Sequence, residues 1–215
     1  MIKTDNPAVG VDRYQLRPRD RFLRADEMPA FLDALECEDE LNHDFFRILL
    51  LTGVRKGNLM AARWKDISLS EGLWKIEAEQ SKNGRSQFVR LAPPVVAVLE
   101  RRKASSSSQF VFAAKSKTGH ITSPKKAWAR VTKRAGIENL CQHDLRRTNA
   151  SWQLAAGATL QEVGKSLNHR DIKSTLVYAH LELEPVKRNV DSAVSNMLKK
   201  GMRGSAEQAP ANEDR

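Results

Sequence analysis

The chain has 215 residues, 40% hydrophobic and 29% charged, which is the size and composition of one or two globular domains with a substantial core. Apolar runs such as residues 48–51 are far shorter than the roughly 18 residues of a membrane span, and the N-terminus lacks the apolar core of a signal peptide. With 2 cysteines, Cys37 and Cys141, and no Cys-x-x-Cys pair, a disulfide framework or cysteine-rich zinc site is not expected, and a reducing, cytoplasmic compartment is favoured.

The charge is concentrated in one segment. The chain carries 36 Lys and Arg against 26 Asp and Glu, a formal net charge of +10. Residues 101–137 hold ten of the basic residues and no acidic one, so the remaining 26 basic and 26 acidic residues cancel. A field of one sign attracts a polyanion, and we therefore expect a nucleic acid as partner. The alternative is a solvated basic surface that only maintains solubility.

The first part of the chain predicts helices. Apolar residues recur at helical spacing over residues 25–35. Residues 41–52 are strongly apolar and end at Gly53, a residue typical of helix C-caps, so a buried helix is predicted there. A short helix over residues 55–63 should follow.

The period then changes to that of β-strands. Three short strands are predicted over residues 66–69, 73–78 and 87–91. Glu-Gly at 71–72 and Asn-Gly at 83–84 lie between them and are typical of hairpin turns.

The basic segment contains an amphipathic helix. Ser123-Pro124 predicts an N-cap with proline at the first helical position, and Gly136 predicts its end. Ala127 and Val131 begin an apolar stripe that Ala135 completes. The opposite stripe is uniformly basic, a face suited to a phosphate backbone, and comprises Lys126, Arg130, Lys133 and Arg134.

Further helices are predicted at residues 95–103, 142–155, 160–167, 172–180 and 185–198. The predicted fold class is therefore mainly α with a small three-stranded antiparallel sheet (α+β). The four tryptophans, Trp64, Trp74, Trp128 and Trp152, are expected in the core, with DNA contact as an alternative for Trp128.

Five short stretches carry residues suited to phosphate chemistry. They are Leu-Thr-Gly-Val-Arg at 51–55, Ser-Lys-Asn-Gly-Arg at 81–85, His-Asp-Leu-Arg-Arg at 143–147, Leu-Asn-His at 167–169 and Thr-Leu-Val-Tyr-Ala-His at 175–180. Each alone is a weak signal, because short motifs of common residues recur by chance. Their order and spacing together resemble the catalytic domain of the tyrosine recombinases, the phage integrase family, over roughly residues 22–198.

The resemblance implies six active-site residues: Arg55, Lys82, His143, Arg146, His169 and Tyr178. It also implies that DNA is cleaved and rejoined through a covalent 3′-phosphotyrosine, with no cofactor and no metal. Arginines suit a phosphodiester because each gives planar, two-pronged donation and keeps its charge.

The remaining roles follow from the same chemistry. Tyr178 would be the nucleophile, and its phenol, with an ordinary pKa of about 10, needs cations and a proton acceptor nearby. His143 is the candidate acceptor or proton carrier, Lys82 the candidate acid for the departing 5′-hydroxyl, and His169 a donor to the phosphate. For His180, packing or capping at the helix end is as good an interpretation as a catalytic role.

Two residues depart from the family pattern. Asn58 stands where the family usually has an acidic residue that would support Arg55. Asn168 stands where the family usually has glycine before His169. Asparagine tolerates a left-handed backbone better than most residues, so we expect that turn to survive.

The expected partner is double-stranded DNA. The candidate DNA-binding residues are Arg85, Lys125, Lys126, Arg130, Lys133, Arg134 and Arg147. The resemblance further implies a tetramer on synapsed DNA and possible accessory DNA-bending proteins, with no membrane partner. The function predicted is integration or excision of a prophage or genomic island in a bacterial or phage context.

The predicted organisation is a linker or arm remnant over residues 1–21, a catalytic DNA breaking-rejoining domain over 22–200 and a disordered tail over 201–215. Because about 20 residues precede Phe22, we expect the catalytic half of an integrase, which alone binds DNA weakly. One alternative is a type IB topoisomerase-like nicking-closing enzyme, and another is a non-catalytic DNA-binding remnant of a mobile element.

Overall fold

The computed structural model describes residues 20–78, 84, 86–169, 173–176 and 194, excluding the side chains of residues 173 and 174. The elements are α1 (Met28–Glu36), α2 (Glu40–Thr52), α3 (Lys56–Met60), η1 (Trp64–Asp66), β1 (Ile67–Ser68), β2 (Leu73–Ile76), β3 (Gln87–Arg90), α4 (Pro93–Ala104), α5 (Lys125–Arg134), α6 (Asp144–Ala155), α7 (Leu160–Ser166) and α8 (Lys173–Leu176). The predicted fold class, mainly helical with one small sheet, is confirmed. The helix predicted over residues 185–198 falls outside the described residues, apart from Val194.

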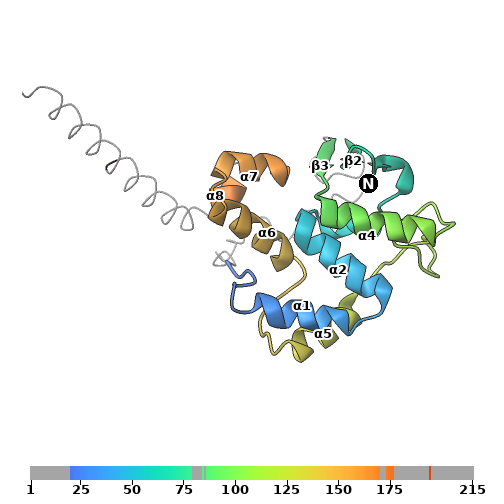
Figure 1. The fold of residues 1–215 in the computed structure, drawn as a ribbon, viewed down its shortest axis with the longest axis horizontal. Helices are drawn as coiled ribbons and strands as arrows, with labels where there is room; N and C mark the ends of the chain where they lie inside the picture. Colours follow the sequence, from blue (N-terminus) through green and yellow to red (C-terminus); the bar gives the residue numbers. More distant parts are fainter. Residues whose placement is uncertain (1–19, 79–83, 85, 170–172, 177–193, 195–215) are drawn as a thin grey trace, which may run out of the picture.

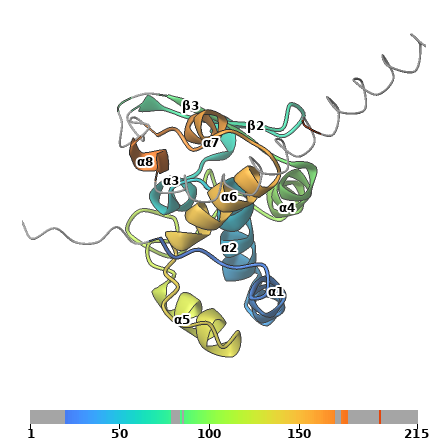
Figure 2. The ribbon, with the colours of Figure 1, turned by 90° about the vertical axis from the view of Figure 1, so that its left-hand side faces the viewer.

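Helix α2 lies at the centre of the molecule, next to α1, α4 and α6 (Figures 1 and 2). The side chain of Asp39 caps its N-terminus by accepting from the backbone N–H of Asn42. Gly53 ends it in the left-handed conformation, with φ of 62°. The predicted buried helix ending at Gly53 is thus confirmed, and its apolar residues supply much of the core.

The sheet has the order β1-β2-β3, and both pairings are antiparallel. Trp74 pairs with Ile67 on one side and Val89 on the other. Gly72 adopts a positive φ of 60° in the first turn, as the Glu-Gly pair predicted. The predicted second turn, 83–84, is described only at Gly84.

Helix α5 begins later than the sequence predicts. Pro124, not Ser123, is the N-cap, because the Pro124 carbonyl accepts the first helical bond from the Trp128 N–H. The predicted apolar stripe is confirmed, since Ala127 and Val131 are buried.

Two hydrophobic clusters hold the fold together. The larger includes edge-to-face contacts between Phe45, Phe46 and Phe112, and Trp128 packs on Phe46. The smaller lies between α6 and α7 and consists of Ala150, Leu154, Val163 and Leu167. The core prediction is wrong for Trp152, whose side chain lies on the exposed face of α6 and is 48% exposed. None of the helices in the described ranges is both long and apolar enough for a membrane span.

Candidate active site

Arg55 stands at the N-cap of α3, where the chain turns out of α2. Gly53 makes this turn possible, because a Cβ there would lie 2.7 Å from Asn149 Oδ1 and 2.9 Å from Leu167 Cδ2. The Arg55 guanidinium is half-buried, and its Nη2 donates to the Asn168 carbonyl over 3.4 Å. Its Nη1 is buried with no hydrogen-bond partner in the described part of the chain. A buried, unused donor on a cation is available to an anionic ligand.

Arg146 lies in the first turn of α6 and is only 4% exposed. Its Nη1 donates to the Gly53 carbonyl over 2.7 Å, and its Nη2 donates to the Leu167 carbonyl. Arg146 therefore joins the end of α2 to the end of α7. These bonds hold the guanidinium plane in one orientation.

The end of α7 presents His169. The helix begins with a capping box between Thr159 and Glu162. It ends in a turn at Asn168, whose φ of 52° confirms the left-handed conformation expected there. The His169 ring contacts Thr175 Oγ1 through Nδ1 at 2.8 Å.

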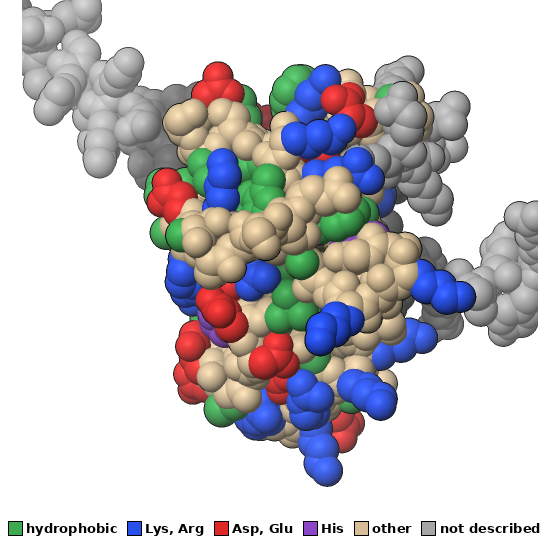
Figure 3. All heavy atoms as spheres, turned by 90° about the vertical axis from the view of Figure 1, so that its right-hand side faces the viewer, with side chains coloured by type: hydrophobic (Ala, Val, Ile, Leu, Met, Phe, Trp, Pro, Cys, Tyr) green, Lys and Arg blue, Asp and Glu red, His purple; other side chains and the backbone are tan. Residues whose placement is uncertain are grey.

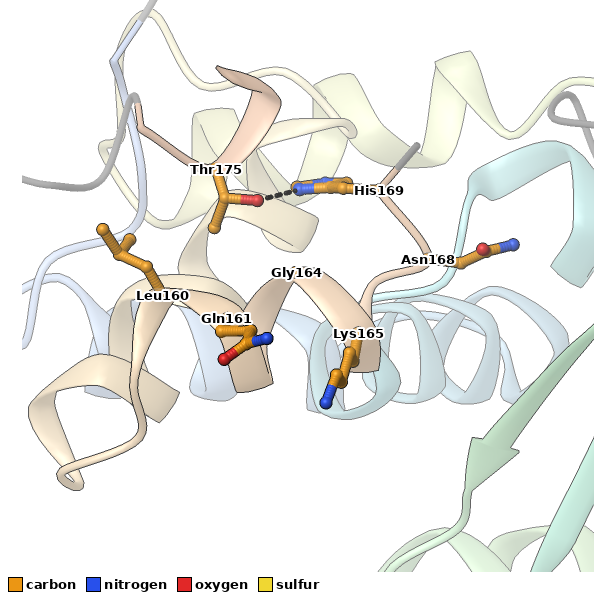
Figure 4. A pocket seen from close by; sticks show the side chains of 7 residues that line it. All are labelled: Leu160, Gln161, Gly164, Lys165, Asn168, His169 and Thr175. Atoms are coloured by element: carbon orange, nitrogen blue, oxygen red, sulfur yellow. Dashed lines mark hydrogen bonds between the residues drawn. The ribbon is translucent and has the colours of Figure 1, made fainter. Parts of the chain in front are cut away.

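A cavity of about 340 Å³ opens beside this turn. Figure 4 shows the His169 and Thr175 side chains in contact at its edge, with Gln161 and Lys165 on α7 and Asn168 beyond the end of that helix. Thr175 lies close to the backbone of Gly164, where a Cβ would come within 3.1 Å of its hydroxyl oxygen. His169 lines this cavity and also belongs to the candidate active site.

The two histidines lie in a positive environment. Burial is the largest of the effects that together lower the pKa of His169 to about 4, and the charges of Arg146 and Arg55 act in the same direction. The pKa of His143 is also lowered, first by removal of the ring from water and then by Arg147 and Arg146, against the opposing charge of Asp144. Both imidazoles are therefore neutral at pH 7. Burial lowers the pKa of Arg55 as well, but from so high a value that it stays charged.

Four of the six predicted catalytic residues thus converge: Arg55, His143, Arg146 and His169. They come from α3, the start of α6 and the end of α7. The other two, Lys82 and Tyr178, lie outside the described residues, as do Arg85 and His180.

Asn58 does not support Arg55 in the way expected of the acidic residue that the family usually has at this position. It is 9% exposed, and its Nδ2 has no hydrogen-bond partner in the described ranges. No side-chain hydrogen bond joins it to Arg55 within those ranges. An amide at this position leaves the Arg55 guanidinium without a carboxylate partner there.

The candidate DNA-binding residues fall into two groups. Lys125, Lys126 and Lys133 are exposed on α5. Three arginines have protein carboxylate partners: Arg130 and Arg134 bind Glu38, and Arg147 Nη1 lies 2.7 Å from Asp144 Oδ1. Figure 3 shows basic side chains beside acidic ones on one face of the molecule.

Three features of the site were not predicted from the sequence: Thr175, Gln87 and the close approach of Asn149 and Leu167 to Gly53. Thr175 lies three residues before Tyr178, a spacing that places two residues on one helix face, so its proximity to the site could have been found. Gln87, which donates to the Ser166 carbonyl over 3.1 Å, carries no sequence signal.

Comparison with known proteins decides the family. The model of the phage integrase family matches residues 21–184. The chain belongs to the phage integrase family. It is 32% identical over 192 residues to the integrase of Salmonella phage P22, covering 81% of this chain and 48% of that protein. It is 29% identical over 193 residues to the tyrosine recombinase XerA of Saccharolobus solfataricus, covering 86% of this chain and 63% of XerA.

Solved structures in this family share the fold. A crystal structure of XerA recombinase has a TM-score of 0.66 at 21% identity, over 80% of this chain and 65% of that one. The catalytic domain of bacteriophage HP1 integrase has a TM-score of 0.60 at 18% identity, over 79% of this chain and 93% of that one. The chain thus spans between about half and two thirds of the curated relatives it matches, and nearly the whole of an isolated catalytic domain.

Proposed function

We propose that this chain is the catalytic part of a site-specific DNA recombinase that integrates or excises a mobile element such as a prophage or genomic island. The observation that carries the proposal is the convergence of two arginines and two neutral histidines at the end of α7. Its members stand in the sequence motifs that resemble those of the tyrosine recombinases, and all four lie within the residues 21–184 that the family model matches.

The arginines would bind the scissile phosphate. Arg55 Nη1 is a buried donor with no partner among the described residues, so a non-bridging oxygen would satisfy it. Arg146 is held rigidly by two backbone carbonyls, which suits a group that must not reorganise as charge develops. Loss of one preorganised donor in such a site typically costs about 10²–10³ in rate.

The covalent step would be a transesterification. Tyr178 Oη attacks phosphorus, the P–O5′ bond breaks, and a 3′-phosphotyrosine forms. The phenolic proton passes to His143, which is neutral at pH 7 and so able to accept it. Lys82 gives a proton to the departing 5′ oxygen. Attack by another 5′-hydroxyl reverses the step, so the energy of the phosphodiester bond is retained.

Double-stranded DNA is the proposed partner. The exposed lysines of α5 would contact its backbone, together with Arg85 and Arg147. The comparisons support this choice: among the structural neighbours is the XerH recombinase bound to its difH substrate, with a TM-score of 0.62 over 74% of this chain.

Assembly on DNA would use an apolar groove around Trp152. Two cavities, of about 340 and 270 Å³, meet at this side chain. Leu32 and Leu51 beside it are 39% and 42% exposed. The C-terminal residues 186–198 have an apolar stripe, and Val194 within it is 47% exposed. We propose that this segment of a neighbouring copy occupies the groove in a tetramer, with DNA-bending proteins as accessories.

The test is a selection for covalent complexes. The protein is incubated with a library of nicked DNA duplexes whose central sequence is randomised. In these duplexes, cleavage releases a short strand, so the reaction cannot be reversed. SDS-resistant complexes are then sequenced. Enrichment of one sequence, followed by strand exchange between two such sites, supports a recombinase. Relaxation of supercoiled plasmid without strand exchange indicates a nicking-closing enzyme, and binding without any adduct indicates a non-catalytic remnant.

A further inference from the structure

Three consecutive backbone carbonyls at the end of α7 each accept a hydrogen bond from a different element. The carbonyls of Leu167 and Asn168 accept from Arg146 and Arg55. The carbonyl of Ser166 accepts from Nε2 of Gln87, the first residue of β3, over 3.1 Å. Carbonyls at a helix C-terminus lack helical partners and carry partial negative charge, so all three donors are well placed.

Gln87 is buried on the inner face of the sheet. Its side chain belongs to a residue only 7% exposed, whereas the next residue, Phe88, points outward and is 64% exposed. Gln87 pairs with Ile76 in the last register position that joins β2 to β3. The Gln87 side chain therefore extends from a paired position of β3 and places its amide group at the last turn of α7.

The bond from Gln87 holds the end of α7 independently of Arg55 and Arg146. Without it, the described side-chain bonds to carbonyls 166–168 would come from the two guanidinium groups alone, and these are the groups proposed to bind phosphate. Because Gln87 also holds this turn, its carbonyls stay in place when Arg55 and Arg146 bind phosphate. It also fixes His169, which follows directly and whose backbone N–H donates to the Gly164 carbonyl over 2.9 Å.

We propose that Gln87 is a positioning residue of the active site: by holding Ser166 it fixes the turn that orients Arg55 and Arg146 and presents His169. The proposal rests on the proposed function for its catalytic consequence. Its structural part concerns described residues alone and can be tested without DNA.

Three variants of the full chain separate positioning from simple stability. Gln87→Met keeps the length of the side chain and removes the donor. Gln87→Lys keeps a donor and adds the cation that a helix C-terminus favours. Val89→Ala is the matched control, because Val89 is buried on the same face of the same strand and its truncation weakens packing without touching Ser166.

The first measurement is the titration of the His169 ring by NMR in the folded protein. In the original chain the pKa should lie well below 6.5, near 4. In Gln87→Met the turn moves away from the arginines and opens to water, so the pKa should rise by about half a unit or more. Val89→Ala should leave it in place, since a change in global stability does not alter the folded environment of His169.

The second measurement is the rate of covalent adduct formation on a nicked substrate. Misplacement of a catalytic group by about 1 Å can cost 10²-fold, so Gln87→Met should slow the reaction about 10- to 100-fold. Gln87→Lys should recover part of that loss, and Val89→Ala should react at nearly the original rate once folded.

The outcomes are distinguishable. An unchanged His169 pKa in Gln87→Met, or an equal loss of rate in Val89→Ala, overturns the positioning role. If the original chain forms no adduct with any duplex, the proposed function fails, and the His169 titration still decides whether Gln87 fixes the turn.

Discussion

Arg55, His143, Arg146 and His169 lie close together near the end of α7. Their mutual electrostatic effects influence the protonation of the two histidines. Arg146 and Arg55 disfavour a charged imidazole at His169, and Arg147 and Arg146 do so at His143. In the proposed reaction both rings would start neutral, His143 as the proton acceptor and His169 as a donor to phosphate. A bound phosphate brings negative charge and should raise both pKa values.

The lowered pKa of His169 predicts a pH dependence of stability. The unfolded ring titrates near 6.5 and the folded ring near 4, so between these values the unfolded state binds more protons. Stability is therefore complete above pH 6.5 and is lost as the pH falls toward 4. We expect the free energy of unfolding to drop by about 1 kcal/mol from this ring between pH 7 and 5, a value reduced for its partial exposure.

Urea unfolding at the two pH values measures this drop. His169→Gln should reduce it, whereas His120→Gln, which removes a histidine outside the cluster, should not. An equal drop in the original chain and in His169→Gln would show that the ring is not held neutral by folding.

Gly53 is the second residue on which the site depends. Gly53→Ala places a Cβ in a left-handed backbone and against Asn149 and Leu167. The strain and the overlap together should cost about 3 kcal/mol of unfolding free energy. Gly136→Ala is the matched control, because its φ of 66° is similar but no atom lies within 4 Å of the added Cβ. It should cost about 1 kcal/mol. Similar losses in the two variants, measured by urea unfolding, would contradict the steric account.

Individual residues of the site were predictable where their chemistry is distinctive. Arg55, His143, Arg146 and His169 stand in motifs whose order carries the signal. Gln87 was not predictable, because its role depends on a contact between β3 and α7 that no local pattern encodes. The partners of Arg130 and Arg134 were missed for the same reason: Glu38 is distant in sequence and adjacent in space.

At the scale of elements, α5 is held by a buried carboxylate from Glu38, in the short connection between α1 and α2. The Glu38 side chain is 1% exposed and lies 3.1 Å from Arg134 Nη1, while Arg130 Nε donates to it over 3.1 Å. Arg134 also donates to the Ala34 carbonyl over 2.9 Å. Part of the basic stripe therefore stabilises the packing of α5 against α1, and the exposed lysines remain the proposed contacts to DNA.

This division predicts the salt dependence of DNA binding. Replacing Lys126 and Lys133 by Gln should reduce the slope of log affinity against log salt by about 0.9 for each phosphate that a lysine no longer neutralises. Arg130→Gln should change the slope little, because its guanidinium binds Glu38. Affinities for one duplex over a series of salt concentrations measure this. A larger change from Arg130→Gln than from the lysine variants would show that DNA displaces Glu38 from α5.

At the scale of the whole molecule, packing among the described residues leaves the apolar groove around Trp152 uncovered. Trp152→Glu should change the free energy of unfolding by no more than about 0.5 kcal/mol, because the side chain is half exposed. It should impair assembly of multimers on DNA, as should deletion of residues 186–215. Native gels of protein–DNA complexes report both effects. Multimers that form as well in Trp152→Glu as in the original chain would assign the groove no part in assembly.

The overall fold was largely predictable because periodicity, glycine C-caps and hairpin turns agree along the chain. Helix α2, the three strands and α5 all lie close to their predicted positions. The burial of Trp152 was mispredicted because tryptophan is usually a core residue, and only the packing of α6 against α2 shows which of its faces is open.

The central claim is that Tyr178 forms a covalent bond to DNA beside the arginines and histidines of this site. Mass spectrometry of the SDS-resistant complex, after nuclease and protease digestion, measures it most directly. We expect a nucleotide linked through phosphate to the peptide that contains Tyr178, its loss in Tyr178→Phe with DNA affinity retained, and a strong reduction in Arg146→Ala. A modification on any other residue, or an adduct that persists in Tyr178→Phe, would contradict the account.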